Sequence, residues 1–236
     1  MVNYECRFCS EITGMNAPSI SILEEASRRL HKAAVLPEEP VLPLSVEAYH
    51  ALREAGILHS GDPVELLEGF LVPKMTKGPR HAAAKRRFLR QLTPLISAPY
   101  FIDSQEAMTS ADSEPEPDIY VVQGPEQKFD SRHPGPGEVE MVVEISESSL
   151  HRDRNWKKRI YARAGVATYW IVNLVNDGIE VFSKPAAGRK KPVYGDTAIY
   201  SRGDRIAVML GGKKVGEIVV SDILGEPVVR RRQKGG

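Results

Sequence analysis

The sequence has little cysteine, no long hydrophobic run and almost no net charge. Its only two cysteines, Cys6 and Cys9, form a single C-x-x-C pair. A structural zinc site needs four ligands and no second pair follows, so an incidental pair is favoured over a zinc or redox site. No apolar run reaches the roughly 20 residues that a membrane span requires, and the first residues lack the pattern of a secretory signal. We therefore expect a cytoplasmic protein without a membrane segment.

The net charge of +1 excludes a protein that binds polyanions through its total charge, but the cations are unevenly distributed. Residues 77–90 and 151–163 are both basic, and the second run contains Asp153 as its only acid. Such runs are either solvated faces or nucleic-acid contacts, and only their context separates these alternatives. The cations of the two runs and of the tail are Lys77, Arg80, Lys85, Arg86, Arg87 and Arg90; Arg152, Arg154, Lys157, Lys158, Arg159 and Arg163; and Arg230, Arg231, Arg232 and Lys234.

The pattern along the chain predicts three parts. Residues 1–41 are expected to be an N-terminal appendage, partly helical or disordered, with one helix over 19–34. Prolines at 37, 40 and 43 then separate this segment from the rest. Residues 42–225 are expected to form the main domain, and residues 226–236 a basic disordered tail.

Within the main domain, helical and strand patterns alternate, which predicts an α/β (α+β) fold around a mixed sheet. Ser45 suits the cap of the first helix, and Glu68-Gly69 suits a turn between two strands. Tyr161 and Trp170 fall in apolar-periodic segments and are interpreted as core aromatics. The expected helices cover 45–55, 81–96 and 152–164, and the expected strands cover 64–72 (a pair), 100–108, 119–122, 139–145, 168–174, 178–182, 194–200, 206–208 and 215–219.

Two carboxylates lie beside predicted buried strands. Asp118 begins one strand and Glu144 lies near the end of another. An ionised carboxylate is costly in such a place unless it is paired or binds a cation. Magnesium takes one or two carboxylates together with water and phosphate, so a metal site is one hypothesis. The alternative is that Asp118 caps a turn and Glu144 pairs with an arginine.

The predicted helix after Glu144 carries Asp153, Lys157 and Tyr161 at positions i, i+4 and i+8, which share one helical face. A lysine on that face could balance the two carboxylates and contact a phosphate. The alternative is an ordinary ion pair on a solvated face.

Several ordered motifs of the chain strongly resemble the Uma2 family of restriction endonucleases in the PD-(D/E)XK superfamily. The resemblance spans about residues 42–225, and it includes Pro117-Asp118, Glu65 to Gly69, and His81. Each motif alone is weak, but their order is specific. The stretches that contribute most to the resemblance are Val142 to Leu150, Asp153, Lys157, Tyr161 to Val166, and Tyr169 to Asn173.

The resemblance implies a restriction-endonuclease-like mixed β-sheet flanked by helices, and it assigns roles to individual residues. Asp118 matches the motif aspartate and Glu144 the motif acid. The position of the motif lysine is Ser146, so the resemblance implies that the lysine has moved to Lys157. Glu65 matches an acid that completes the metal shell. His81 is expected to face the cleft near Glu65, with an ordinary core or surface histidine as the alternative.

The activity implied by the resemblance is hydrolysis of DNA phosphodiester bonds with Mg²⁺, for which Mn²⁺ can substitute. Asp118, Glu144 and the carbonyl of Ile145 would hold the metal, and Lys157 would stabilise the developing charge. Contacts to DNA would be mostly to its phosphate backbone, and the enzyme would be a homodimer. The rival hypotheses are a catalytically silent nucleic-acid-binding or protein-interaction module, and a different phosphodiesterase or repair activity. Thr168 and Asn173 replace acids common in the family, with little expected effect.

Overall fold

The computed structural model describes residues 41–59, 61–186 and 192–226, and the described residues from Pro43 onward form one compact unit. The predictions for Cys6 and Cys9, for the helix over 19–34 and for the basic tail lie outside these residues. Among the described helices, none has the length and hydrophobicity needed to cross a bilayer.

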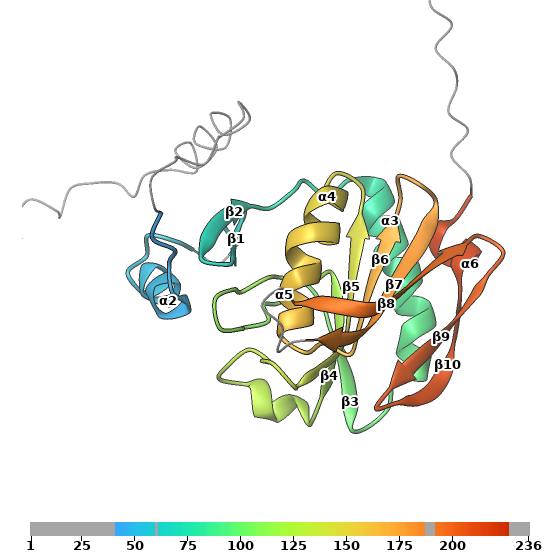
Figure 1. The fold of residues 1–236 in the computed structure, drawn as a ribbon. Coiled ribbons are helices and arrows are strands. Elements are labelled where there is room, and N and C mark those ends of the chain that lie inside the picture. Colours follow the sequence, from blue (N-terminus) through green and yellow to red (C-terminus); the bar gives the residue numbers. More distant parts are fainter. Residues whose placement is uncertain (1–40, 60, 187–191, 227–236) are drawn as a thin grey trace, which may run out of the picture. The chain divides into compact units, whose positions relative to one another are not determined.

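The centre of the fold is a six-stranded sheet in the order β3-β4-β5-β6-β7-β8 (Figure 1). β5 and β6 run parallel, and every other neighbouring pair is antiparallel. This arrangement confirms the predicted mixed sheet. The six strands are β3 (Tyr100–Asp103), β4 (Ile119–Gln123), β5 (Val139–Ser146), β6 (Thr168–Asn173), β7 (Gly178–Ala186) and β8 (Val193–Ser201).

A helical segment connects the parallel strands β5 and β6, because two parallel neighbours need a crossover. This crossover helix consists of α4 (Leu150–Arg152), the π-helical turn η3 (Asp153–Lys157) and α5 (Lys158–Arg163). It packs on one face of the sheet, where Tyr161 and Ala162 join Val142 and Tyr169 in a buried cluster. The prediction of a helix here is confirmed, but the π turn was not expected.

The opposite face of the sheet is covered by α3 (Pro79–Leu92), by the hairpin of β9 (Arg205–Leu210) and β10 (Lys213–Val219), and by α6 (Val220–Leu224). Phe88 of α3 meets Trp170 of β6 edge-on, with ring centroids 5.8 Å apart. Trp170 and Tyr161 are both buried, which confirms them as core aromatics.

A small hairpin of β1 (Val64–Leu67) and β2 (Phe70–Pro73) follows α2 (Val46–Glu54). Ser45 caps α2 by accepting a hydrogen bond from Ala48 N at 3.1 Å, as predicted. The hairpin turns at Glu68 and Gly69, which both have positive φ. Gly69 is required there, since a Cβ would collide with Pro43. An isolated bridge between Leu66 and Glu114 connects the hairpin to the chain before β4.

The structure differs from the sequence prediction mainly between β3 and β4. The strand expected over 100–108 ends at Asp103, and most of the following residues to Asp118 are irregular. Pro115 and Pro117 lack the N–H groups that a ladder needs, which explains the irregular chain. β7 and β8 are longer than predicted. The short helices η2 (Glu126–Phe129) and α6 were not predicted, whereas η1 (Thr93–Leu95) follows α3 within the helix expected over 81–96.

Candidate active site

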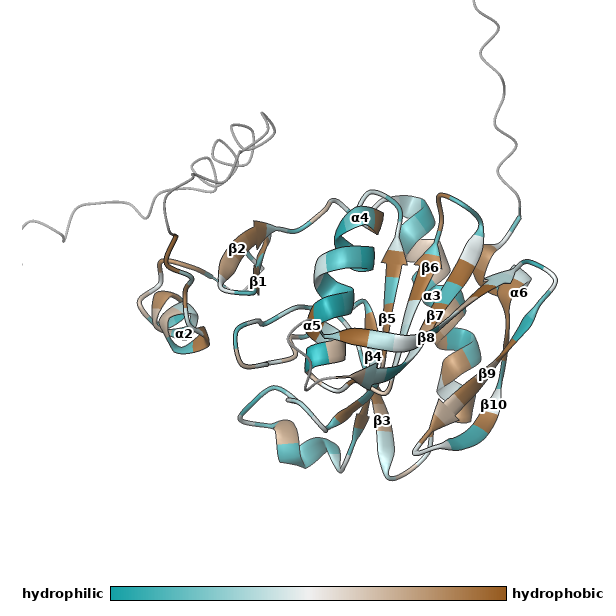
Figure 2. Ribbon diagram, viewed as in Figure 1, coloured by the Kyte–Doolittle hydropathy of each residue, from teal (hydrophilic) through white to brown (hydrophobic). Residues whose placement is uncertain are grey.

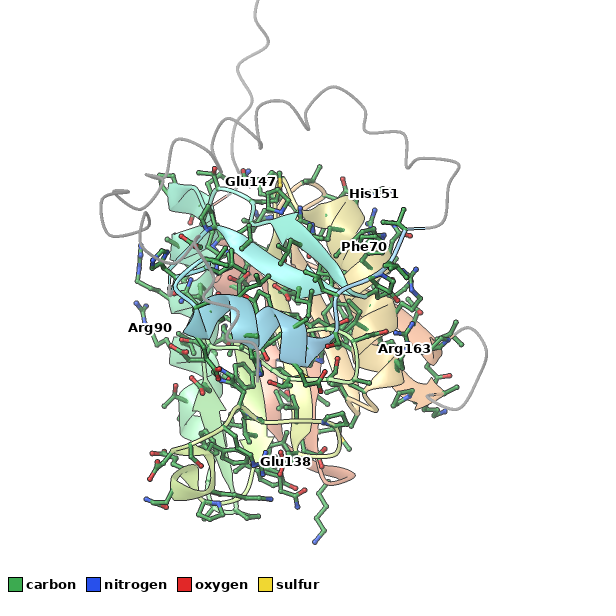
Figure 3. The ribbon with its side chains drawn as sticks, turned by 90° about the vertical axis from the view of Figure 1, so that its left-hand side faces the viewer. Phe70, Arg90, Glu138, Glu147, His151 and Arg163 are labelled. Carbon is green, nitrogen blue, oxygen red and sulfur yellow. The ribbon has the colours of Figure 1, made fainter. Side chains whose placement is uncertain are left out.

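A polar cleft lies where β5 ends and β4 begins, at the mouth of the crossover. The segment before α3, the hairpin β1–β2, the sheet and the crossover helix all contribute to it. Glu147, just beyond β5, is labelled in Figure 3. The residues that line the cleft are Glu65, Lys74, Met75, Thr76, Lys77, Gly78, His81, Glu116, Asp118, Glu144, Ile145, Glu147, Ser148, Ser149, Arg152, Asp153 and Lys157.

Asp118 is held from several sides. The register pairs Ile119 with Val143, so Asp118 comes next to Glu144 at the end of the antiparallel pair. Its Oδ2 lies 2.8 Å from His81 Nε2 and accepts a hydrogen bond from Ile145 N at 2.9 Å. Because a carboxylate can only accept, His81 Nε2 carries the proton. These contacts fix the orientation of the Asp118 carboxylate.

The second oxygen of Asp118 has no hydrogen-bond donor among the described residues, although it is buried. Lys77 Nζ lies 2.9 Å from this Oδ1, close enough for an ion pair but without hydrogen-bonding geometry. Burial alone would raise the pKa of Asp118, but the His81 hydrogen bond, the Lys77 charge and the Ile145 N–H together hold it below its usual range. Asp118 is therefore an ionised carboxylate whose Oδ1 has an ion pair with Lys77 but no hydrogen bond from the described residues.

Glu144 and Lys157 form the second part of the site. The Lys157 ammonium lies 2.9 Å from Glu144 Oε1 and 3.1 Å from Glu65 Oε2, and all three side chains are buried. Tyr161, one turn further along the crossover helix, donates to the same Glu144 oxygen at 2.7 Å. The shared face predicted for Lys157 and Tyr161 therefore points at Glu144.

Charge and burial act in opposite directions in this pair. Burial raises the pKa of Glu144, and the neighbouring carboxylates of Asp153, Asp118 and Glu65 raise it further against the Lys157 charge. Burial lowers the pKa of Lys157, but Glu144, Glu65 and Asp153 outweigh it and hold this pKa above its usual range. Lys157 is therefore the fixed positive charge of the site.

Ser146 occupies the position where the motif would place lysine, and its hydroxyl donates to Asp153 Oδ2 at 2.6 Å. Ser149 donates to the same oxygen at 2.6 Å. Asp153 is buried at the start of the π turn, and Lys157 ends that turn. The two serines thus anchor the carboxylate at one end of the turn that presents Lys157.

All the predicted site residues line this cleft, although two of them make contacts that were not expected. His81 contacts Asp118, whereas the prediction placed it near Glu65. Glu65 faces cations, since Arg152 NH1 lies 3.4 Å from its Oε1 in addition to the Lys157 contact. Lys77 and Arg152 were not predicted as site residues. Their membership of the two basic runs was the only signal in the sequence.

The cleft offers oxygen ligands that suit magnesium. Asp118 Oδ1 accepts no hydrogen bond from the described residues, and Lys157 and Tyr161 both donate to Oε1 of Glu144. Ser146 O accepts from Leu174 N, so the neighbouring Ile145 carbonyl points to the other side of β5, where Ile145 N meets Asp118. No group of three or more His, Cys, Asp or Glu in the described chain forms a ready metal cluster. The donor set therefore fits a magnesium ion bound by two carboxylates, a carbonyl and water.

Comparison with known families decides the classification. The Uma2 family, described as "Putative restriction endonuclease", matches residues 46–211. The chain belongs to the Uma2 family. The matched residues include Glu65, His81, Asp118, Glu144 and Lys157. No curated protein matches the sequence.

A solved structure has the same fold as this Uma2 chain. It is the crystal structure of "a putative nuclease belonging to DUF820" from Anabaena variabilis. The TM-score is 0.57 at 14% sequence identity, over 77% of this chain and 98% of that one. At this identity the likeness shows the fold alone. Family and fold together place the chain among restriction-endonuclease-like nuclease domains.

Proposed function

We propose that this chain is a metal-dependent endonuclease that hydrolyses phosphodiester bonds of DNA, with magnesium as its metal. The observation that carries the proposal is Asp118 Oδ1, a buried and ionised oxygen opposite Glu144 that has no hydrogen-bond donor in the described part of the chain and whose nearby cation, Lys77 at 2.9 Å, is partly exposed. Buried polar atoms are nearly always satisfied, so such an atom at the mouth of a cleft favours a missing cation.

Asp118, Glu144 and the Ile145 carbonyl would hold the magnesium ion. Once bound, magnesium supplies Lewis-acid activation of water and of a phosphodiester oxygen. Six acids line the cleft (Glu65, Glu116, Asp118, Glu144, Glu147 and Asp153) against four cations (Lys74, Lys77, Arg152 and Lys157), so the local charge favours an added cation. His81 acts as a positioning residue, because its bond to Asp118 Oδ2 fixes the carboxylate and leaves Oδ1 free to bind a metal.

Lys157 would serve the reaction as a fixed cation. It is buried and protonated, and Glu144 and Glu65 hold its ammonium in place. A preorganised charge of this kind stabilises negative charge that develops on a phosphoryl group. Lys77 is more exposed and lines the same cleft, where it could contact a neighbouring phosphate.

The test is nicking of a supercoiled plasmid by the purified full chain, with Mg²⁺ and with excess chelator. We expect nicked and linear product with the metal only. Asp118→Asn should abolish it, and Asp222→Asn, at an exposed aspartate of α6, should not. Equal cleavage by the Asp118→Asn variant would show that a contaminant cuts the DNA and would overturn the proposal. We further propose a homodimer, because each site cuts one strand of a duplex. Light scattering measures its mass.

One observation favours the second candidate, a catalytically silent module that keeps the fold. Lys157 already lies between Glu65 and Glu144, where it neutralises these acids as a cation would. In that case Mn²⁺ would not bind, and the wild type would leave the plasmid intact. Calorimetry with Mn²⁺ separates the two candidates. The endonuclease must bind the metal through Asp118 and Glu144, whereas the silent module would not bind it.

A further inference from the structure

The two basic runs of the sequence have different surroundings in the folded chain. The acids that neutralise the crossover helix come from elsewhere in the sequence. Glu68 on the hairpin β1–β2 pairs with both Arg159 and Arg163, and Glu180 on β7 pairs with Arg154 at 2.7 Å. Arg152 and Lys157 face Glu65, and Lys158 Nζ lies 4.8 Å from the centre of the Phe182 ring. Every cation of this run is therefore already engaged.

The cations of α3 remain largely unpaired. Lys85, Arg86, Arg87 and Arg90 have no acidic partner within salt-bridge distance in the described ranges. Arg86 and Arg90 are exposed and lie one turn apart, so they share a face. Figure 3 shows the labelled Arg90 on the opposite side of the ribbon from Arg163. Unpaired cations on a regular spacing attract a polyanion better than cations that already hold acids.

The cations of this run begin beside the cleft, at Lys77 and Lys85, and continue at Arg86 and Arg90 on the solvent-facing side of α3, about 140° and 180° round the helix from His81. Lys77 and His81 both contact Asp118, and Lys85 follows His81 by one turn of α3. Burial lowers the pKa of Lys85, on which the charges of Asp118 and Lys77 also act, so its ammonium lies near the same site. From His81 to Arg90 the helix rises about 13 Å. One strand of duplex DNA carries a phosphate every ~3.4 Å along the axis, so this length matches about four phosphates.

We propose that duplex DNA lies with its phosphate backbone along the solvent-facing side of α3, held by Arg86 and Arg90, and reaches the cleft at Asp118 past Lys85 and Lys77. The crossover helix then contributes Lys157 to the site but little to backbone binding. This inference rests on the proposed endonuclease, since it names the surface that brings the substrate to that site. Phosphate contacts give affinity without sequence specificity, so this surface would serve DNA of any sequence.

The test measures binding of the full chain to a short labelled DNA duplex by fluorescence anisotropy, in chelator so that no cleavage occurs. The variants Arg86→Gln/Arg90→Gln and Arg159→Gln/Arg163→Gln remove the same charge from the two helices. A third pair, Arg205→Gln/Lys213→Gln, removes it from exposed positions of β9 and β10. Melting curves verify that each variant is folded. Affinity is recorded over roughly 50 to 200 mM salt.

We expect the α3 pair to bind roughly tenfold more weakly and to lower the salt slope by about 1.8, or ~0.9 for each lost phosphate contact. The other two pairs should lose less than about twofold. Equal losses in the α3 pair and in the β9–β10 pair would overturn the inference, as would a larger loss in the crossover-helix pair or a wild type that does not bind the duplex.

The outcome is separable from that of the proposed function. A plasmid that is cut with Mg²⁺ while the α3 pair binds like wild type sinks this inference alone. DNA binding that depends on α3 without any cleavage supports this inference and sinks the endonuclease. Hydrolysis of a small chromogenic phosphodiester with Mn²⁺ adds a direct readout of the site, and the α3 pair should leave it unchanged.

Discussion

Neighbouring residues of β5 are buried alike but differ in chemistry. Met141 to Val143 pack apolar side chains on both faces of the sheet, whereas Glu144 directly after them is buried against Lys157. Figure 2 shows a related contrast, with hydrophobic strands β5 and β6 beside a hydrophilic crossover helix. Burying an apolar side chain contributes about 1.5–3 kcal/mol, while burying a charge costs free energy unless it is well paired. The apolar residues of β5 thus stabilise the fold, whereas its buried Glu144 costs stability.

The buried charges around Glu144 are tolerated because each has a partner on another element. Lys157 meets Glu144 and Glu65, and Asp153 accepts from Ser146 and Ser149. A buried ion pair is weak evidence for stability, since an apolar replacement of similar volume is often as stable. This cluster of buried charges lies at the mouth of a cleft and lowers the stability of the fold. It is therefore better explained by the chemistry of the site than by folding. The following predictions test this difference between the residues that stabilise the fold and those that serve the site, from the largest expected effect to the smallest.

The largest effect is expected from Asp118→Ala and Glu144→Ala. We expect each to abolish Mn²⁺ binding, because each removes one of the two carboxylates proposed to hold the metal. The fold should survive, since the carboxylates repel each other and Lys157 keeps Glu65 as a partner when Glu144 is removed. Calorimetry measures metal binding, and circular dichroism measures the fold. Wild-type affinity in either variant would remove that residue from the metal site.

The next effect concerns the lysine that replaces the motif lysine. Lys157→Ala should lower cleavage by ~10²-fold or more, because it removes a fixed charge from the transition state. Lys158→Ala is the matched control, since its side chain is about 100° further round the helix, over Phe182. It should change cleavage little. Rates are compared at saturating Mg²⁺. The assignment is wrong if Lys158→Ala is the inactive variant, and the lysine mechanism is wrong if neither variant slows cleavage.

The sequence predicted the sheet well because its signals are local. Runs of apolar residues mark β4, β5 and β6, the Glu68-Gly69 pair marks the hairpin turn, and Ser45 marks the start of α2. The order of the motifs further predicted which residues gather in the cleft. Asp118, Glu144, Lys157, Glu65 and His81 all line it.

The contacts between distant residues could not be predicted in the same way. The partner of His81 depends on how α3 packs against the start of β4, and the acids that neutralise Arg154, Arg159 and Arg163 come from β7 and the hairpin. Neither has a signature in the local sequence. The π turn was missed for a different reason, because Ser146 and Ser149 hold Asp153 through local side-chain hydrogen bonds that helix propensity does not include.

A smaller effect separates two adjacent residues, Asp118 and Ile119. Ile119 is fully buried in the apolar cluster under α3. Ile119→Val should therefore lower the free energy of unfolding by about 0.5–1.5 kcal/mol through the lost methyl group. Mn²⁺ affinity should stay at the wild-type value, because the main chain that positions Asp118 is unchanged. Urea unfolding and calorimetry measure the two quantities. A variant that loses metal affinity but not stability would show that Ile119 serves the metal site and not the apolar core.

The smallest effect is expected from deletion of residues 1–40. The prolines at 37, 40 and 43 separate this segment from the main domain, and the family match begins only at residue 46. All the cleft residues lie from Glu65 onward. We therefore expect the truncated protein to keep its free energy of unfolding within about 1 kcal/mol and to cut plasmid at the wild-type rate. A truncation after Glu54, which removes α2 and its buried Tyr49, is the destabilising comparison. If both truncations lower the melting temperature equally, residues 1–40 are part of the folded domain, and the predicted boundary at residue 41 is wrong.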